Sequence, residues 1–201
     1  MFRKFFLCLF IFAICFSIGI AIAIAELKNT SKSAEFMEWN GPWRVNPSMA
    51  LKSRKQRALI ALVGLFALRE TEVVYYSADV DSNGDPLSSA YDYKLVGAVP
   101  DARYWNYTLY GADDFLIPNP DKIYSYNSST IEYEPFDSNN PEMQHIKSPT
   151  YEMHISKTNK TKNWLPSGDN EKLVITLRMY NPSKEVYQDL TKVPLPQIIR
   201  I

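Results

Sequence analysis

The longest hydrophobic stretch lies at the amino-terminal end, where residues 5–25 are all apolar or small and Arg3 and Lys4 precede them. A helix of this length covers roughly 30 Å, about the hydrocarbon thickness of a bilayer. A cleaved signal peptide has a shorter apolar segment, but Ala23-Ile24-Ala25 fits its small-residue cleavage site. We therefore expect residues 1–25 to be a transmembrane signal-anchor or a signal peptide. Both alternatives predict that the rest of the chain is extracytoplasmic, in the periplasm.

Two segments of different character follow the apolar stretch. Residues 26–40 are polar and show no clear periodicity, which is typical of a linker. Asn46 and Pro47 then fit the N-cap and the first position of a helix that continues to about residue 68. The second half of this predicted helix is apolar on nearly every face but too short to cross a membrane. We expect it to pack in the core of the domain.

Short runs rich in β-branched and aromatic residues begin at Val73 and alternate with turn residues. The predicted strands are residues 73–80, 91–96, 103–110, 115–118, 122–126, 151–155 and 172–180. Strands of this length and spacing favour an antiparallel β-sandwich or a jelly roll. Residues 134–149 are rich in Pro, Asn and Ser and are predicted to be a long loop. The sequence thus predicts one mainly β domain over residues 41–201, with one N-terminal packing helix and a transmembrane helix before it.

Charge and cysteine content exclude several classes of function. The chain has 22 basic and 22 acidic residues, so it has no basic field that would bind a nucleic acid. Both cysteines, Cys8 and Cys15, lie inside the apolar segment. The predicted domain therefore has no disulfide, no cysteine nucleophile and no thiolate metal site. We expect no cofactor.

Several sequence blocks, in order, carry a resemblance to a known family. They are GPWRVNP (41–47), DSNGDPL (81–87), RYWNYTLYGADDFLIPNPDKIYSY (103–126), and NWLP with LVITLRMYNP (163–182). Together they resemble a bacterial family catalogued as domain of unknown function 1214. The resemblance implies a β-sandwich-like domain, often membrane-associated or exported, with no agreed activity. This chain has Lys122-Ile123-Tyr124 where relatives carry Asn-Arg-Tyr, so no ligand role of that arginine is carried over.

Asp79, Asp81, Asn83 and Gly84 follow the spacing of the first half of a calcium-binding loop. The twelfth position, which should be a bidentate glutamate, is Ala90, and the flanking segments are predicted to be strands. The alternative is a β-hairpin with an Asn-Gly turn. The hairpin is the favoured interpretation, and calcium binding by Asp79, Asp81 and Asn83 remains a weak alternative.

No complete catalytic motif is present. The chain contains neither HExxH nor a G-x-S-x-G nucleophile elbow, and its only histidines, His145 and His154, are isolated residues outside any such motif. Asp113 and Asp114 are adjacent and are better explained as turn residues than as the paired carboxylates of a glycosidase. The sequence therefore assigns no catalytic residue.

Aromatic residues and one arginine are the best candidates for ligand contact. Alternation along the strand puts Trp105 and Tyr107 on one face and Tyr110 on the other. Trp105 and Tyr107 could form a sugar-stacking platform or, alternatively, part of the core. Arg178 lies between apolar neighbours, and it either faces outward or is paired in a pocket. The candidate ligand-binding residues are Trp105, Tyr107, Tyr110, Asn119, Tyr124, Trp164 and Arg178.

Two hypotheses for the function follow. The first is a membrane-anchored extracytoplasmic β-sandwich that binds an unknown small molecule or an envelope protein, with membrane contact through residues 5–25. The second is an enzyme that acts on a small or carbohydrate-like substrate through Tyr, Arg and carboxylate groups. A purely structural role in an envelope assembly is a third possibility, because sandwich folds host all three kinds of function.

Overall fold

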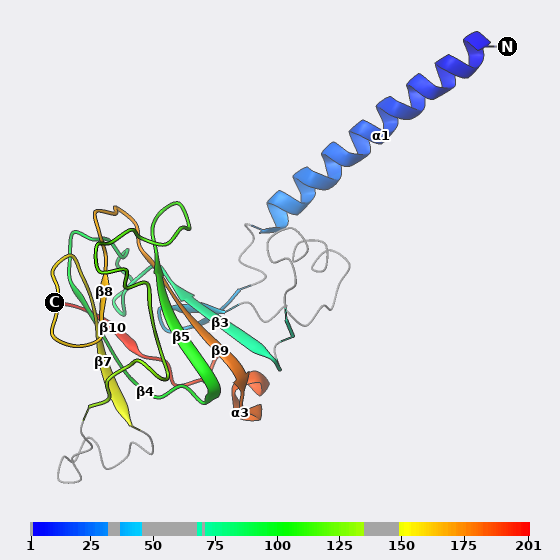
Figure 1. Cartoon of the computed structure of the whole chain (residues 1–201). Helices are drawn as coiled ribbons and strands as arrows, with labels where there is room; N and C mark the ends of the chain where they lie inside the picture. Colours follow the sequence, from blue (N-terminus) through cyan, green and yellow to red (C-terminus); the bar gives the residue numbers. More distant parts are fainter. Residues whose placement is uncertain (1, 32–36, 46–67, 70, 135–148) are drawn as a thin grey trace. The chain divides into compact units, whose positions relative to one another are not determined.

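The computed structural model describes residues 2–31, 37–45, 68–69, 71–134 and 149–201, which fall into two compact units (Figure 1). Within the described residues, the first unit is helix α1 (Phe2–Ser31). The second, which we term the β-domain, comprises the described residues from Met37 onward. The predicted packing helix between residues 47 and 68, and most of the predicted loop at 134–149, lie outside the described residues.

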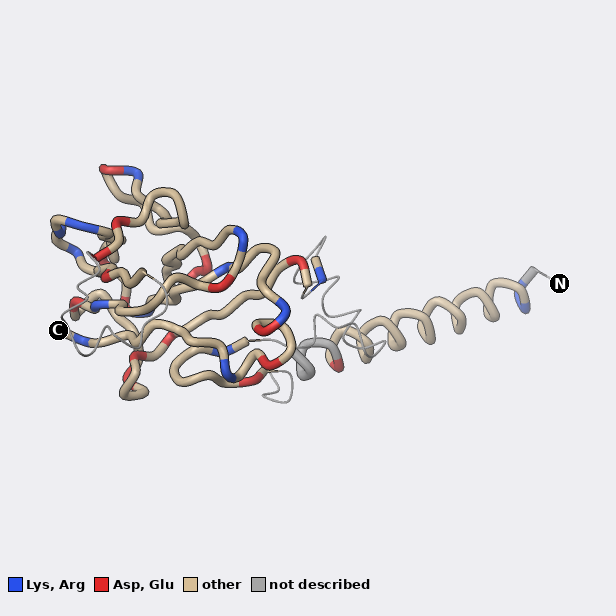
Figure 2. Tube along the Cα trace, turned by 90° about the horizontal axis from the view of Figure 1, so that it is seen from below, with Lys and Arg blue, Asp and Glu red and all other residues tan. Residues whose placement is uncertain are grey.

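Helix α1 contains the segment Arg3–Glu26, which is long and apolar enough to cross a membrane. Its large side chains between Arg3 and Glu26 are exposed, for example Phe10 at 64% and Phe12 at 66%. No charged residue interrupts it between Lys4 and Glu26, as the uniform colour of the helix in Figure 2 shows. Its length and composition fit a membrane anchor and a signal peptide equally well. The helix continues beyond residue 25 to Ser31.

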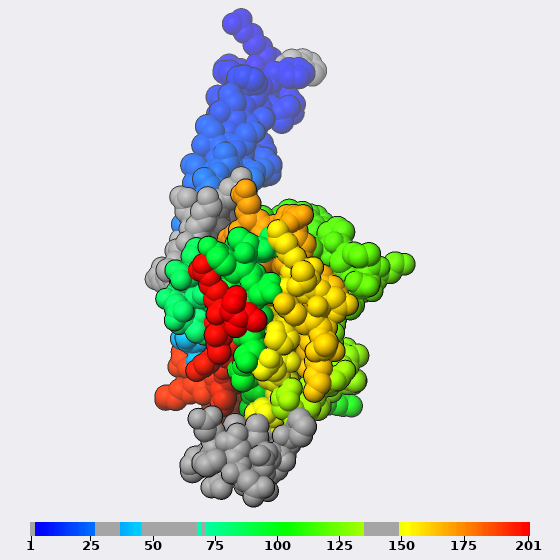
Figure 3. Space-filling view, turned by 90° about the vertical axis from the view of Figure 1, so that its left-hand side faces the viewer, coloured from blue at the N-terminus to red at the C-terminus, as the bar shows by residue number. Residues whose placement is uncertain are grey.

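The β-domain contains two sheets, which confirms the prediction of a mainly β fold. The larger sheet has the order β1-β2-β3-β9-β5-β6, with strands β1 (Glu38–Asn40), β2 (Trp43–Val45), β3 (Val73–Ala78), β9 (Val174–Pro182), β5 (Ala102–Tyr110) and β6 (Ser125–Asn127). The smaller has the order β10-β4-β7-β8, with strands β10 (Gln197–Arg200), β4 (Tyr93–Ala98), β7 (Thr150–Ser156) and β8 (Trp164–Pro166). Figure 3 looks onto the smaller sheet, where red β10, green β4 and yellow β7 lie side by side. A short helix, α3 (Lys184–Gln188), follows β9.

The structure differs from the predicted strands in several details, since β1, β2, β8 and β10 lie outside the predicted segments. Strand β8 pairs with β7 in parallel, whereas the other strand pairs in the described residues are antiparallel. The predicted strand at 115–118 is wrong, because this segment forms only an isolated bridge between Tyr110 and Leu116. Asp114 has a φ of 63° and Phe115 N–H donates to Asp113 Oδ1, which confirms the predicted turn there.

An aromatic cluster joins the inner faces of the two sheets into one core. The ring of Trp105 on β5 stacks on that of Tyr151 on β7 with centroids 5.6 Å apart. The Tyr107 and Tyr151 hydroxyls form a hydrogen bond of 2.5 Å. Burial, and then the neighbouring phenol, raise the pKa of Tyr107 well above its usual value, so both phenols stay neutral. Trp43 adds a bond from its indole N–H to the Pro196 carbonyl at 2.8 Å. This arrangement is sandwich-like.

Candidate functional site

The face of the larger sheet opposite the core carries polar and aromatic side chains in regular rows. Strands β3, β9 and β5 are neighbours, and their register places residues of the three strands directly beside one another. The rows are Tyr75–Arg178–Asn106, Ser77–Thr176–Thr108 and Val73–Tyr180–Tyr104. Because side chains alternate along a strand, these residues share one face. Arg178 lies in the middle strand of this face.

Three neutral groups accept hydrogen bonds from the Arg178 guanidinium. Its Nη1 donates to Thr108 Oγ1 at 3.1 Å and, more weakly, to Asn106 Oδ1 at 3.4 Å. Its Nη2 donates to the Tyr110 hydroxyl at 2.5 Å. The Arg178 Cζ also lies 5.6 Å from the Tyr110 ring centroid and 5.9 Å from that of Tyr75, within the range of cation–π contacts. We term Tyr75, Asn106, Thr108, Tyr110 and Arg178 the Arg178 cluster.

The charge of Arg178 has no counter-ion in the part of the chain that the structure describes. Arginine has five N–H donors in a planar fork, and the three bonds above leave the Nε–H and one Nη2–H without an acceptor among the described residues. Half-buried charges are normally paired, because partial desolvation is costly without a partner. The cluster therefore holds a guanidinium in place, and two of its donors have no acceptor among the described residues.

Tyrosine side chains extend the cluster toward one end of the sheet. The Tyr104 and Tyr180 rings are 5.7 Å apart and tilted at 47°, and Tyr104 is 38% exposed. Burial and the neighbouring Tyr180 raise the pKa of Tyr75, although the Arg178 charge opposes this. The face thus combines a cation, hydroxyl groups and aromatic rings, which can contact an anionic ligand with a ring or hydroxyl groups.

Two of the predicted ligand-binding residues belong to the core instead. Trp105 and Tyr107 are 1% and 0% exposed, so neither is accessible to a ligand from solvent. Tyr104 and Tyr110 lie on the opposite face, which confirms the predicted alternation of β5. The physical reason is that Trp105 and Tyr107 fill the space between the sheets, as the alternative interpretation of the sequence stated. Neither residue is therefore part of the candidate site.

Asn119 and Trp164 stabilise loops. Both polar atoms of the Asn119 side-chain amide bond to nearby backbone. Its Nδ2 donates to the Ile117 and Ile123 carbonyls, and its Oδ1 accepts from Ile123 N–H. The Trp164 indole N–H donates to the Ser156 carbonyl at 2.9 Å, and the side chain is buried. Tyr124 lies just before β6 and is 36% exposed, and no described hydrogen bond or ring contact joins it to Arg178. Of the predicted residues, the structure brings together Tyr110 and Arg178.

The weak calcium alternative is not supported by the geometry of residues 79–85. Asp79 pairs with Arg44 at 2.9 Å and with Lys172 at 3.5 Å. Asp81 Oδ1 accepts the backbone N–H groups of Asn83 and Asp85, so it closes the turn. Gly84 has a φ of 92°, as the favoured hairpin requires. No group of three acidic, His or Cys side chains suited to a metal is present in the described ranges.

The Asp79 ion pair gives a testable pH dependence. Burial tends to raise the pKa of Asp79, but the hydrogen bond and charge of Arg44, helped by Lys172, leave the pKa below its usual value. Such a carboxylate stabilises the fold above its usual pKa, and this contribution is lost as pH falls through the lowered value. We expect Asp79→Asn to flatten the loss of unfolding free energy between about pH 5 and about pH 2. Urea denaturation at several pH values in this range measures the slope of unfolding free energy against pH. Asp121→Asn is the control. If this slope is the same for Asp79→Asn and wild type, the role assigned to the Asp79 ion pair is wrong.

The one described histidine, His154, adds no catalytic group to this face. His154 lies on β7 in the smaller sheet, with its Nε2 3.1 Å from Glu152 Oε1. His145 lies outside the described residues. Burial raises the pKa of Tyr76, Tyr107 and Tyr151 most strongly, and all three side chains are buried in the core.

Comparison with known proteins agrees with the β-rich architecture. The VPA0106 protein from Vibrio parahaemolyticus matches with a TM-score of 0.59 and 22% identity over 74% of this chain, which spans 35% of that protein. An uncharacterised protein from Burkholderia cenocepacia matches with a TM-score of 0.39 and 15% identity, over 65% of this chain and 29% of that protein. The first match supports a similarity of fold alone, and nothing is inferred from the second.

No curated protein matches the sequence. The sequence model of the protein family of unknown function DUF1214 matches residues 72–184. This range runs from the start of β3 to the start of α3 and includes the whole Arg178 cluster. The earlier resemblance is thereby confirmed over the centre of the β-domain. The chain belongs to the DUF1214 family.

Proposed function

We propose that this protein is a membrane-anchored extracytoplasmic binding domain whose ligand carries an anionic group that pairs with Arg178. The observation that carries the proposal is a half-buried guanidinium that, within the described part of the chain, has only neutral acceptors and two donors without an acceptor. A carboxylate or phosphate is the group whose geometry matches two adjacent N–H donors of an arginine. The ligand then completes a charge pair for which the sheet already holds the cation.

The surroundings of Arg178 favour a ligand that also has hydroxyl groups or a ring. Thr108, Asn106 and Tyr110 orient the guanidinium, and the half-buried Asn106 and Tyr110 offer further polar contacts beside it. Tyr75 and Tyr104 supply ring surface at neighbouring positions on the same face. A sugar acid or a sugar phosphate combines these features, since its ring packs on aromatic surface while its acid group meets the arginine.

The apolar segment of α1 supports the anchored location. Arg3 and Lys4 precede it, which favours a cytoplasmic amino terminus and an extracytoplasmic β-domain. In this topology the ligand is a molecule of the envelope or the cell exterior. No observation in the described residues specifically favours the enzyme hypothesis.

The proposal predicts that Arg178→Gln weakens binding of an anionic sugar about tenfold or more. A charged hydrogen bond contributes about 1.5–3 kcal/mol, and each 1.4 kcal/mol is a factor of ten in affinity. The measurement is a calorimetric titration of the full chain in detergent with D-glucuronate and with D-glucose 6-phosphate. D-glucose, which lacks the charge, is expected to bind no better to wild type than to Arg178→Gln.

Arg103→Gln is the matched control, because Arg103 is an exposed arginine on the same strand as three residues of the cluster. This variant changes the net charge equally and should bind like wild type. Equal affinity of wild type and Arg178→Gln for both anionic sugars would contradict the proposal. So would a preference of the wild type for D-glucose.

A further inference from the structure

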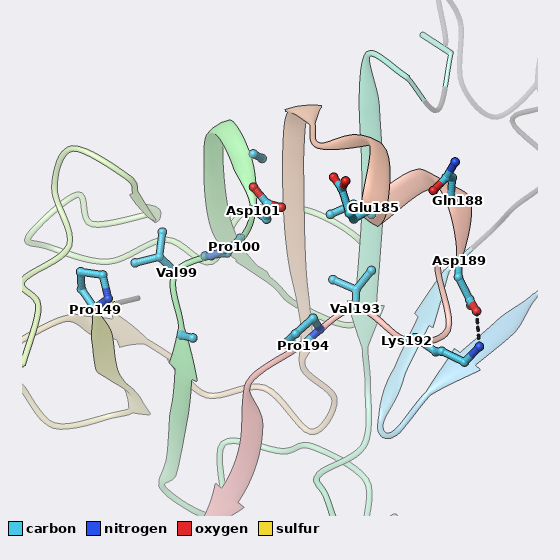
Figure 4. A pocket seen from close by; sticks show the side chains of 13 residues that line it. Val99, Pro100, Asp101, Pro149, Glu185, Gln188, Asp189, Lys192, Val193 and Pro194 are labelled. Atoms are coloured by element: carbon cyan, nitrogen blue, oxygen red, sulfur yellow. Dashed lines mark ion pairs between the residues drawn. The ribbon is translucent and has the colours of Figure 1, made fainter. Parts of the chain in front are cut away.

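A pocket lies at one end of the β-domain. It is a pocket of about 770 Å³ between the β4–β5 turn, α3 and the segment that leads into β10 (Figure 4). It shares no residue with the Arg178 cluster. Its volume is within the range of about 300–1,000 Å³ that holds small-molecule ligands in proteins.

Apolar side chains form much of the lining of this pocket. Val186 and Val193 are 3% and 6% exposed and are parts of the hydrophobic core. Val99, Pro100 and Pro194 add apolar surface around them. Two of these residues are prolines, whose rings restrict the backbone. The pocket therefore offers a preformed apolar surface rather than one that must be assembled on binding.

The lining of the pocket contains more acidic than basic side chains. Lys192, its basic residue, is bound to Asp189, with Nζ 2.7 Å from Oδ2. Asp101 and Glu185 have no ion-pair partner among the described residues. In Figure 4 both carboxylates lie on the same side of the pocket, above Val193 and Pro194. A ligand over the apolar surface would therefore meet two free carboxylates at one edge.

We propose that this pocket binds a small organic cation, an amine whose apolar body rests on the accessible apolar lining at Val99 and Pro194 while its ammonium group meets Asp101 and Glu185. Charge complementarity selects this chemistry, because the two exposed carboxylates would repel an anion, and a neutral molecule would form no charged hydrogen bond with them. A bare metal ion would leave the apolar walls unused. The proposal is independent of the function assigned to Arg178.

The test compares three ligands with the same ring and different charges: cyclohexylammonium, cyclohexanol and cyclohexanecarboxylate. Each is titrated into the full chain in detergent and followed by calorimetry. We expect cyclohexylammonium to bind at least tenfold more tightly than cyclohexanol, with no binding of the carboxylate. The double variant Asp101→Asn/Glu185→Gln should bind the amine at least tenfold more weakly than wild type does.

Two controls separate this pocket from other effects. Asp121→Asn/Glu171→Gln removes the same number of exposed carboxylates elsewhere and should bind the amine like wild type. Arg178→Gln should also leave amine binding unchanged, so failure here is distinct from failure of the proposed function. Neither Asp101 nor Glu185 has a described side-chain partner, so the double variant should unfold at the temperature of wild type. Absence of amine binding, equal binding of the three ligands, or unchanged binding by the double variant would overturn the proposal.

Discussion

Asn163→Ala is expected to lower the free energy of unfolding by about 3–5 kcal/mol. The Asn163 side chain is buried and connects two segments: its Nδ2 donates to the Glu132 and Glu152 carbonyls, and its Oδ1 accepts from Glu132 N–H. Loss of the amide removes three hydrogen bonds, each of which contributes about 1 kcal/mol, and leaves backbone groups unsatisfied. The φ of Asn163 is 41°, a conformation that asparagine tolerates better than alanine. Urea denaturation of the full chain in detergent, followed by far-UV circular dichroism, measures the change.

Asn181→Ala is the matched control for this substitution. Asn181 also has a positive φ, of 46°, but it is exposed and its side chain makes no described hydrogen bond. Its replacement should cost only the conformational penalty, about 1 kcal/mol. If the two variants are equally stable, the hydrogen bonds of Asn163 do not stabilise the fold as we infer.

Trp105→Ala is expected to have a destabilising effect of about 3–5 kcal/mol, the usual cost of removing a buried tryptophan. The indole stacks on Tyr151 and meets the Tyr107 ring edge-on at 5.7 Å, so its loss opens a cavity between the sheets. The same denaturation experiment measures this change. Trp39→Ala provides the control, since Trp39 is 52% exposed and its removal should change stability by less than about 0.5 kcal/mol. If Trp105→Ala is as stable as wild type, Trp105 does not stabilise the core, and its alternative role as a ligand-stacking residue is favoured.

Much of the β-domain could be predicted because its longer strands carry their own pattern. Segment 103–110 has alternating side chains, and the structure places β5 at Ala102–Tyr110 with its predicted faces. Strands β1, β8 and β10 have three or four residues each. A segment this short shows no alternation of its own and is ordered by its neighbours, as β10 is by β4. These strands could not be recognised from local sequence.

The Arg178 cluster was only partly predictable because it depends on strand order. Its hydrogen bonds join β9 to residues about 70 positions earlier in the chain, with separations of 72, 70 and 68 residues. The sequence identified Arg178 and Tyr110 and left open whether Arg178 faces outward or is paired. It gave no reason to include Tyr75, whose strand becomes the other neighbour of β9 only in the fold. Asn106 and Thr108 could have been included from the alternation of β5.

Two candidate residues from the family-like blocks, Asn119 and Trp164, use their side-chain hydrogen-bonding groups within the fold. Asn119 and Trp164 belong to the sequence blocks that resemble the family, yet both bind backbone carbonyls and hold loops. Residues that fix a loop and residues that bind a ligand look the same in a motif. Hydrogen-bond partners distinguish them, because a side chain whose donors and acceptors are all used internally has none left for a ligand.

Native mass spectrometry of the full chain, gently extracted from membranes, tests the central proposal most directly. Wild type and Arg178→Gln are compared, with Arg103→Gln as the control. The proposal predicts that wild type and Arg103→Gln carry the same additional non-protein mass, which is an anionic molecule, and that Arg178→Gln has lost it. Identical spectra for wild type and Arg178→Gln, whether loaded or bare, would contradict the role of Arg178, as would a retained ligand that carries no negative charge.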